Sequence, residues 1–324
     1  MKYIEFHDCL SAAHCFAIEE YIINNHDFRD DYFLLWHTRP TLMTGRFQNT
    51  IEEININYAE EKNLEIVRRN SGGGTIYTDE NCWQFSFITW KNAGEIKDFQ
   101  DFTRPVILAL KSLGVNAQFS GRNDLLVNGK KFSGNAQFGV KDRFLHHGSI
   151  LFDANLENLI KALNVTDEKI ISKGIKSIKE RVTNIKEHLI NPNVSSLEFR
   201  NQLVELLKKD MPTITLSDTD FDAIKKIEKE KFLSWEWNFG KSPEFNFRKT
   251  QRFSGGKIDV QLNVKNGIIT NCKIFGDFFY VGDISNIENS LIGTHYRKAD
   301  IYDKLKKAEF CSISIDELFS CFID

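Results

Sequence analysis

Several features that mark common protein classes are missing from this sequence. It has no excess of positive charge, since 42 Lys and Arg residues stand against 45 Asp and Glu residues. A basic domain or stripe is the usual mark of nucleic-acid binding, so no nucleic-acid partner is expected. The first eight residues, MKYIEFHD, carry charge inside any candidate apolar run, which excludes a signal peptide and a membrane anchor. We therefore expect a cytoplasmic protein with no membrane partner.

Paired cysteines are also missing. The six cysteines are scattered without a CxxC pair, which argues against a zinc site and against a secreted disulfide framework. Most are expected to be small core residues. Cys82 lies near a glycine-rich stretch, but no histidine stands at a spacing that marks a nucleophile pair, so a structural role is favoured there.

The chain is long and rich in phenylalanine. Its 324 residues exceed one ordinary domain and include 27 Phe, which predicts two domains with aromatic cores. Residues 257–264 alternate between apolar and polar, and a turn and a second strand follow them, which indicates a separate small unit. We place the boundary so that residues 1–244 form one domain and residues 245–324 the other.

The most informative stretch is RRNSGGGTIYTD at residues 68–79. Strand-like segments precede and follow it, at residues 64–67 and 83–90. Glycines let backbone N–H groups approach a ligand closely, and the guanidinium groups of Arg68 and Arg69 suit carboxylate or phosphate. No Gly-Lys-Ser/Thr and no helix follow, so it is neither a Walker loop nor a Rossmann fingerprint. The alternatives are an anion site and a plain mobile hairpin.

A second stretch, residues 121–137, reads GRNDLLVNGKKFSGNAQ. Its Asn-Gly at 128–129 predicts a tight hairpin, after which Lys131, Ser133 and Asn135 share one strand face. Lys131 is then either an exposed edge charge or a ligand-binding cation. Asn123 and Asp124 are either a simple turn or, with that lysine, part of a magnesium-nucleotide site.

Two further segments carry candidate polar residues. A helix capped by Asp8 and running to residue 23 has an apolar face of Cys15, Ile18 and Ile22, with Glu19 at its edge. A solvated charge is the favoured interpretation of Glu19, and a ligand contact is the alternative. His146 and His147 are adjacent in a strand over residues 144–152, so they face opposite ways and cannot easily chelate one ion. They are expected to be structural or ligand-lining.

These motifs, in this order and spacing, resemble the lipoate-protein ligase A family. The resemblance rests on RRNSGGGT at 68–75, GRNDL at 121–125, KFSGNA at 131–136 and HHGS at 146–149. KGI at 173–175 with Ser177 and RVTN at 181–184, within the lysine-rich region 164–191, look like the loop that covers the adenylate, and SWEWNFG at 234–240 looks like the signature before the small domain. The resemblance covers nearly the whole chain. One departure is Thr78, because the family commonly has histidine before the aspartate that is Asp79 here.

The resemblance implies an α+β fold, with a biotin/lipoate ligase-like mixed-sheet catalytic domain and a small α+β C-terminal domain. It implies an enzyme that activates lipoate with ATP and Mg²⁺ to lipoyl-AMP, releases pyrophosphate, and then acylates a lysine of a carrier domain. Lys131 would be catalytic, spanning the lipoate carboxylate and the α-phosphate, and Asp124 would hold magnesium. Residues implied in adenylate binding are Arg69, Gly74, Thr75, Ile76, Tyr77, Asn123, Asp124 and Lys131. Those implied in lipoate binding are Arg69, Ser71, Gly72, Gly73, Lys131 and His147.

Other functions stay open at this point. An acyltransferase could move lipoyl or octanoyl groups between carriers without ATP, although no cysteine lies near Lys131 to serve as its nucleophile. A non-catalytic scaffold could bind lipoyl-adenylate, although intact Lys131 and Asp124 speak against it. The expected partners are lipoyl-carrier proteins, either the acyltransferase subunit of a 2-oxoacid dehydrogenase or the glycine-cleavage H-protein. A monomer is the expected state.

Overall fold

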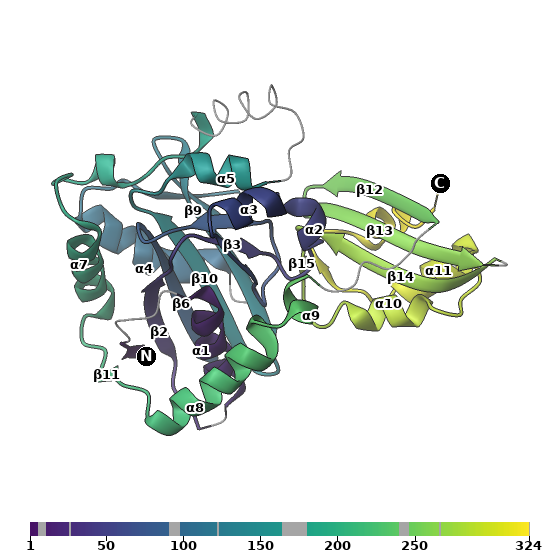
Figure 1. The fold of residues 1–324 in the computed structure, drawn as a ribbon, viewed down its shortest axis with the longest axis horizontal. Coiled ribbons are helices and arrows are strands. Elements are labelled where there is room, and N and C mark those ends of the chain that lie inside the picture. The colour runs from purple at the N-terminus through teal and green to yellow at the C-terminus, as the bar shows by residue number, and fades with distance from the viewer. Residues whose placement is uncertain are drawn as a thin grey trace.

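A computed structural model describes residues 1–5, 11–25, 27–90, 98–121, 123–163, 180–239, 246–265 and 267–323 of the chain. A larger N-terminal part and a smaller C-terminal part lie side by side (Figure 1). Within the described ranges, no helix has the length and apolar character needed to cross a membrane.

An eight-stranded sheet forms the centre of the larger part. Most neighbours are antiparallel, but β1 runs parallel to both β2 and β11, so the sheet is mixed. In spatial order its strands are β11 (Thr213–Ile214), β1 (Lys2–Ile4), β2 (Tyr32–His37), β6 (Cys82–Trp90), β10 (Arg143–Leu151), β9 (Lys130–Val140), β8 (Asp124–Val127) and β7 (Gln118–Ser120).

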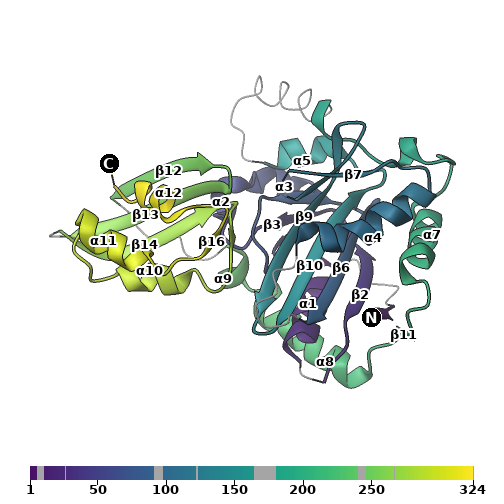
Figure 2. The same ribbon diagram turned by 180° about the vertical axis from the view of Figure 1, so that it is seen from behind.

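Helices cover both faces of this sheet, because its strands carry apolar side chains on both sides. On one face lie α1 (Ala12–Asn24), α8 (Asp218–Ile227) and the π-helix η2 (Glu228–Phe232), packed around Phe16 and Phe232. On the other lie α4 (Phe99–Ser112) and α7 (Ser196–Lys208), as Figure 2 shows. Two hydrophobic cores of buried residues therefore sandwich the sheet, which holds the central strands rigidly in place.

A smaller sheet carries the glycine-rich stretch. It consists of β4 (Glu65–Arg68), β3 (Thr41–Thr44) and β5 (Ile76–Thr78), with β3 in the centre. Three short helices lie near it, α2 (Thr50–Glu53), α3 (Ile56–Glu61) and α5 (Leu156–Ala162). Residues 69–75 connect β4 to β5, so both ends of the glycine loop are anchored in one sheet.

The C-terminal part is a three-stranded antiparallel meander with helices on one side. Its strands are β12 (Phe247–Phe253), β13 (Gly256–Lys265) and β14 (Ile268–Gly276), and a two-stranded ribbon pairs β15 (Phe279–Tyr280) with β16 (Phe310–Cys311). The helices are α10 (Ser285–Leu291), α11 (Lys298–Leu305) and α12 (Ile315–Ser320). A capping box begins α12, with the Ser314 hydroxyl accepting from the Glu317 amide.

The two parts meet at an aromatic contact. The ring of Phe47, from the N-terminal part, stacks on that of Phe278 with centroids 4.8 Å apart, and Phe47 belongs to the core cluster of the C-terminal part. The amide of Gly276 donates to the carbonyl of Phe47 at 2.6 Å. The short helix α9 (Trp235–Asn238) precedes the C-terminal part and lies near β4. The turn between β14 and β15 is thereby held next to the glycine loop.

Local predictions mostly match these elements, with two differences. The cap of α1 is Ser11, whose hydroxyl accepts from the His14 amide, so the prediction that Asp8 caps this helix is wrong; Asp8 itself lies outside the described residues. At the hairpin, Asn128 and Gly129 both have positive φ, as a type I′ turn requires, but the pairing register then shifts between Leu125 and Leu126. This bulge leaves Phe132 without a partner on β8 and breaks the simple alternation predicted there.

Candidate active site

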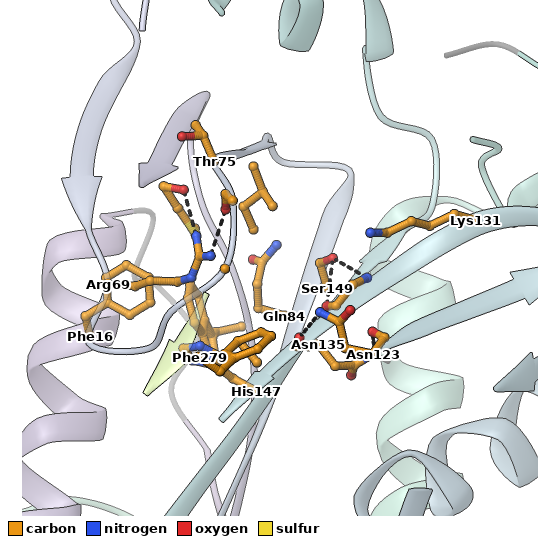
Figure 3. A pocket seen from close by; sticks show the side chains of 18 residues that line it. Phe16, Arg69, Thr75, Gln84, Asn123, Lys131, Asn135, His147, Ser149 and Phe279 are labelled. Carbon is orange, nitrogen blue, oxygen red and sulfur yellow. Dashed lines mark hydrogen bonds between the residues drawn. The ribbon is translucent and has the colours of Figure 1, made fainter. Parts of the chain in front are cut away.

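A cavity opens between the glycine loop and the main sheet. Figure 3 shows Arg69 on one side of it and Lys131 on the other. Apolar side chains from α1, β2, β3 and the C-terminal part complete the wall, namely Phe16, Trp36, Met43 and Phe279. The cavity thus combines cationic groups with an apolar lining, as sites for amphipathic ligands do.

The guanidinium of Arg69 shapes the glycine loop from inside. It donates to the carbonyls of Met43 at 2.8 Å, Gly72 at 2.8 Å and Gly74 at 2.7 Å. Arg69 is only 5% exposed, and among the described residues its guanidinium donates to backbone carbonyls and the Ser71 hydroxyl and forms no ion pair with a carboxylate. Burial, and secondarily the charge of Arg68, lower the pKa of Arg69 to about 10, so it still carries its proton at neutral pH. An unbalanced buried cation beside a cavity favours an anionic ligand.

Arg68 has a different task, because it ties the loop to α9. Its side chain donates to five carbonyl oxygens and one hydroxyl, on Trp237, Gly45, Arg46, Gln48, Asn238 and Thr50. The Arg68 amide also donates to Asn238 Oδ1 at 2.8 Å, and Trp237 Nε1 donates to the Arg68 carbonyl at 2.8 Å. Arg68 does not line the cavity, so of the two adjacent arginines only Arg69 reaches the site.

Lys131 lies opposite, on β9. Its Nζ is 2.7 Å from Asp124 Oδ1, across the hairpin. The position of Asp124 is fixed by its neighbour Asn123, which exchanges hydrogen bonds with Asn135: each side-chain amide donates to the other residue's carbonyl, at 2.6 and 3.0 Å. At Lys131, β9 pairs with Leu126 of β8 on one side and forms an isolated bridge with Val182 on the other, so Lys131 is not a charge on an edge strand.

The two adjacent histidines separate as predicted. His147 lines the cavity, where its Nε2 lies 2.6 Å from Ser71 Oγ and its Nδ1 lies 3.2 Å from both carboxylate oxygens of Glu19. Glu19 is 1% exposed and also accepts from the Ser86 hydroxyl at 2.6 Å. The prediction that Glu19 is a solvated charge is therefore wrong: the helix turns it toward the sheet, where His147 and Ser86 provide its partners.

His146 points to the opposite face and is fully buried among phenylalanines. Its ring lies over Phe102 at 4.8 Å, its Nδ1 accepts from Gln137 Nε2 at 3.0 Å, and its Nε2 donates to Asn135 Oδ1 at 3.2 Å. Burial, and secondarily His147, lower the pKa of His146 well below its ordinary value. His146 is therefore a neutral residue that braces Asn135 from behind the cavity.

This burial predicts a loss of stability in mild acid. Because the folded-state pKa of His146 lies below the unfolded value of about 6.5, the unfolded chain takes up a proton that the folded chain does not. Above a pH of about 6.5, the contribution of neutral His146 to stability is present in full. As the pH falls below that value, the free energy of unfolding should decrease by up to about 1.4 kcal/mol per pH unit. Urea unfolding at pH 7 and pH 5 measures this difference.

His146→Phe should reduce that pH dependence, whereas His295→Phe, at an exposed histidine of the C-terminal part, should keep it. If both variants lost the same stability as the wild type between pH 7 and pH 5, His146 would not be the titrating group.

Comparison with known proteins identifies the family. Residues 11–208 match the lipoyl protein ligase A/B catalytic domain, and residues 242–322 match the C-terminus of bacterial lipoate protein ligases. The chain belongs to the lipoate-protein ligase family. It is 45% identical to lipoate-protein ligase LplJ of Bacillus subtilis (strain 168) over 295 residues, which are 90% of this chain and 89% of that protein.

Solved ligases share the fold. LipL1 of P. falciparum, crystallised with lipoate, superposes with a TM-score of 0.81 at 24% identity and covers 99% of this chain and 98% of its own. A lipoate-protein ligase A bound with ATP gives a TM-score of 0.63 at 22% identity, over 74% of this chain and 98% of its own. The α+β prediction of a lipoate ligase-like domain with a C-terminal addition is thereby confirmed.

In this ligase fold, most of the predicted site residues come together. Eight of them line the cavity: Arg69, Gly73, Gly74, Thr75, Ile76, Asn123, Lys131 and His147. Ser71 and Asp124 contact this lining through His147 and Lys131. Gly72 packs against the C-terminal part, since a Cβ there would lie 2.2 Å from the carbonyl of Phe278. Tyr77 faces away into the small core around Leu42, so at the site it offers only its main chain.

Sequence reasoning missed several lining residues. Phe16 and Gln84 belong to elements that were predicted, and Trp36 lies on β2, but only the tertiary packing aims these side chains into the cavity. Phe279 comes from the other part of the chain, and no local pattern indicates it. Cys82 is fully buried outside the cavity, and burial, followed by the charge of Asp79, raises the pKa of its thiol, which agrees with a structural role. The predicted adenylate-covering loop falls largely on residues 164–179, outside the described residues.

Proposed function

We propose that this protein activates lipoate with ATP to lipoyl-AMP, releasing pyrophosphate, and transfers the lipoyl group to a lysine of a carrier protein. The observation that carries the proposal is the pair of cations, Arg69 and Lys131, facing each other across one cavity with an apolar wall. Lipoate is an apolar chain ending in a carboxylate, and ATP is a polyanion, so their reacting ends need positive charge and the lipoyl tail needs an apolar surface. The named relatives act on lipoate, and one of the same fold is bound with ATP.

In the first step Lys131 would bring the lipoate carboxylate against the α-phosphate. The two groups repel each other, and a flexible ammonium can contact oxygens of both as negative charge develops between them. In the free protein Asp124 Oδ1 holds the Lys131 ammonium at 2.7 Å, so the lysine is kept close to where it would act. The backbone of Gly73 and Gly74 and the strand after them would line the adenylate, and Arg69 would add positive charge to that wall.

Magnesium is proposed as the metal that accompanies ATP. Asp124 is partly exposed and offers one carboxylate, which suits an ion held by one or two protein carboxylates together with phosphates and water. The described residues contain no group of three or more potential ligands, so a metal cage made of protein alone is not indicated. When bound, magnesium would neutralise phosphate charge. Asn123 would assist by fixing the turn that presents Asp124.

The remaining assignments follow from this chemistry. Ser71, Gly72, Gly73 and His147 would border the lipoyl chain, with Glu19 orienting the His147 ring. We propose lipoyl domains of 2-oxoacid dehydrogenases or the glycine-cleavage H-protein as acceptors, a monomeric enzyme, and the ATP-rich cytoplasm as its location. We keep residues 1–244 and 245–324 as the proposed domains; the boundary falls within residues 240–245, outside the described residues.

The test is pyrophosphate release from ATP by the purified protein without any carrier. Release that requires lipoate is the expected result, and adding an apo-carrier domain should then give a lipoylated lysine, detected by mass spectrometry. If no pyrophosphate appears while acyl groups pass from one carrier protein to another, the protein is a transferase and the nucleotide assignments fail. Among the described residues no cysteine lines the cavity, which makes a thiol-based transfer the less fitting chemistry.

A further inference from the structure

The floor of the cavity carries a glutamine that the chemistry above does not use. Gln84 lies on β6, directly between Trp36 of β2 and Ser149 of β10 in the strand pairing. It is 3% exposed, lines the cavity, and lies between Arg69 and Lys131 in Figure 3. Its side chain is therefore held on rigid central strands and faces the place where both substrates would meet.

One half of the Gln84 amide is satisfied and the other is not. Its Nε2 donates to Thr78 Oγ1 at 2.8 Å, whereas its Oε1 is buried without a hydrogen-bond partner among the described residues. Buried acceptors are nearly always paired, so an unpaired one that faces a cavity indicates a ligand that brings a donor. Gln48, the other buried glutamine beside the glycine loop, differs from Gln84 in that its Oε1 is paired. It accepts hydrogen bonds from the Gly45 amide and the Thr75 hydroxyl, both at 2.9 Å.

The substrates differ in what they can donate. The lipoate carboxylate, the dithiolane and the triphosphate offer only acceptors at neutral pH. The nucleoside offers N–H and O–H donors, on the purine amino group and on the ribose. We infer that Gln84 Oε1 accepts a hydrogen bond from the nucleoside of ATP and that Gln84 is a determinant of nucleotide binding; this rests on the proposed function.

Thr78 acquires a role from the same geometry. The Thr78 hydroxyl oxygen accepts a hydrogen bond from Gln84 Nε2 and a longer one, at 3.4 Å, from the Thr38 hydroxyl. With Nε2 engaged there, the amide is fixed with its oxygen toward the cavity. The threonine that stands where the family commonly has histidine is thus a positioning residue for Gln84.

Gln84→Met tests the inference, because methionine keeps the length of the side chain and removes the acceptor. In the lipoate-dependent pyrophosphate assay we expect the KM for ATP to rise about tenfold, the size typical of one lost hydrogen bond to a buried group, with the KM for lipoate unchanged. A rise in the KM for lipoate alone would overturn the inference.

ATP analogues then distinguish the two sources of the donor. If a ribose hydroxyl is bound, the wild-type preference for ATP over 2′-deoxy-ATP or 3′-deoxy-ATP should shrink about tenfold in Gln84→Met. If the purine amino group is bound, the preference over inosine triphosphate should shrink instead. Either result supports the inference, whereas preferences that stay unchanged for all three analogues overturn it.

A matched control comes from the C-terminal part. Gln261 on β13 is 2% exposed, and within the described residues neither of its amide atoms has a hydrogen-bond partner, but it does not line the cavity. Gln261→Met should leave every nucleotide preference at the wild-type value.

Should Gln84→Met not fold, as judged by circular dichroism, Thr78→Val carries the test. Thr78→Val removes the oxygen that holds the Gln84 side-chain amide in place, so it should raise the KM for ATP. An unchanged KM for ATP overturns the inference. Absence of lipoate-dependent pyrophosphate release in the wild type would instead refute the proposed function, so the two failures are distinguishable.

Discussion

Lys131→Ala is expected to reduce lipoate-dependent pyrophosphate release by a factor of about 10³ or more while the protein stays folded. The Lys131 ammonium is the cationic group that lines the cavity opposite Arg69, and removing a group that stabilises developing negative charge typically costs about 10² to 10³ in rate. Alanine also leaves the charge of Asp124 without its lysine next to the triphosphate, which adds repulsion. Single-turnover release of pyrophosphate measures the rate, and circular dichroism on the same sample shows whether the protein is folded.

Lys130→Ala is the matched control. Lys130 precedes Lys131 on β9, is exposed, and does not line the cavity, so its loss should leave the rate within about twofold of wild type. A Lys131→Ala protein that still released pyrophosphate at the wild-type rate would refute the assignment of Lys131, and with it the main argument for charge stabilisation at this site.

Arg68→Met is expected to be the most destabilising single substitution at the glycine loop, by at least about 3 kcal/mol of unfolding free energy. The substitution keeps most of the aliphatic stem and removes the guanidinium, which donates to five carbonyl oxygens from Gly45, Arg46, Gln48, Trp237 and Asn238. Most of these oxygens lie where water cannot replace the lost donor, and each unpaired buried acceptor costs about 1 to 3 kcal/mol. Urea unfolding followed by tryptophan fluorescence would report the loss, since Trp237 belongs to the affected contact.

The comparison is Arg39→Met. Arg39 pairs with Glu65 at 3.0 Å, but its side chain is 56% exposed, and exposed ion pairs contribute at most about 1 kcal/mol. Equal stability losses in the two variants would mean that the buried contacts of Arg68 contribute no more than a surface pair, contrary to the expectation.

The fold could be predicted from sequence where the signal is local. The Asn128–Gly129 hairpin and the C-terminal strands that begin at residue 257 appear as expected, because turn geometry and strand alternation depend on residues close in the chain. The candidate site was predictable to the same extent: the glycine loop and the lysine hairpin carry local patterns, and both line the cavity.

What could not be predicted depends on contacts between distant residues. Glu19 looked like a surface charge because its partners, Ser86 and His147, are 67 and 128 residues away. The resemblance implied a ligand-binding role for Arg69, but nothing in the sequence indicated that Arg68 holds the loop to α9. Gln84 gave no signal, since a glutamine in a central strand becomes informative only when its unpaired oxygen is seen.

Phe47 belongs by position to the first part of the chain and by packing to the last. Its ring covers Phe278, and its carbonyl receives the Gly276 amide, so the C-terminal core is complete only when this N-terminal residue is present. During evolution, the C-terminal part could therefore not be exchanged between relatives as an independent unit. A chimera that joined it to a relative with a small residue at the position of Phe47 would leave the Phe278 ring uncovered, so these two positions are constrained to change together.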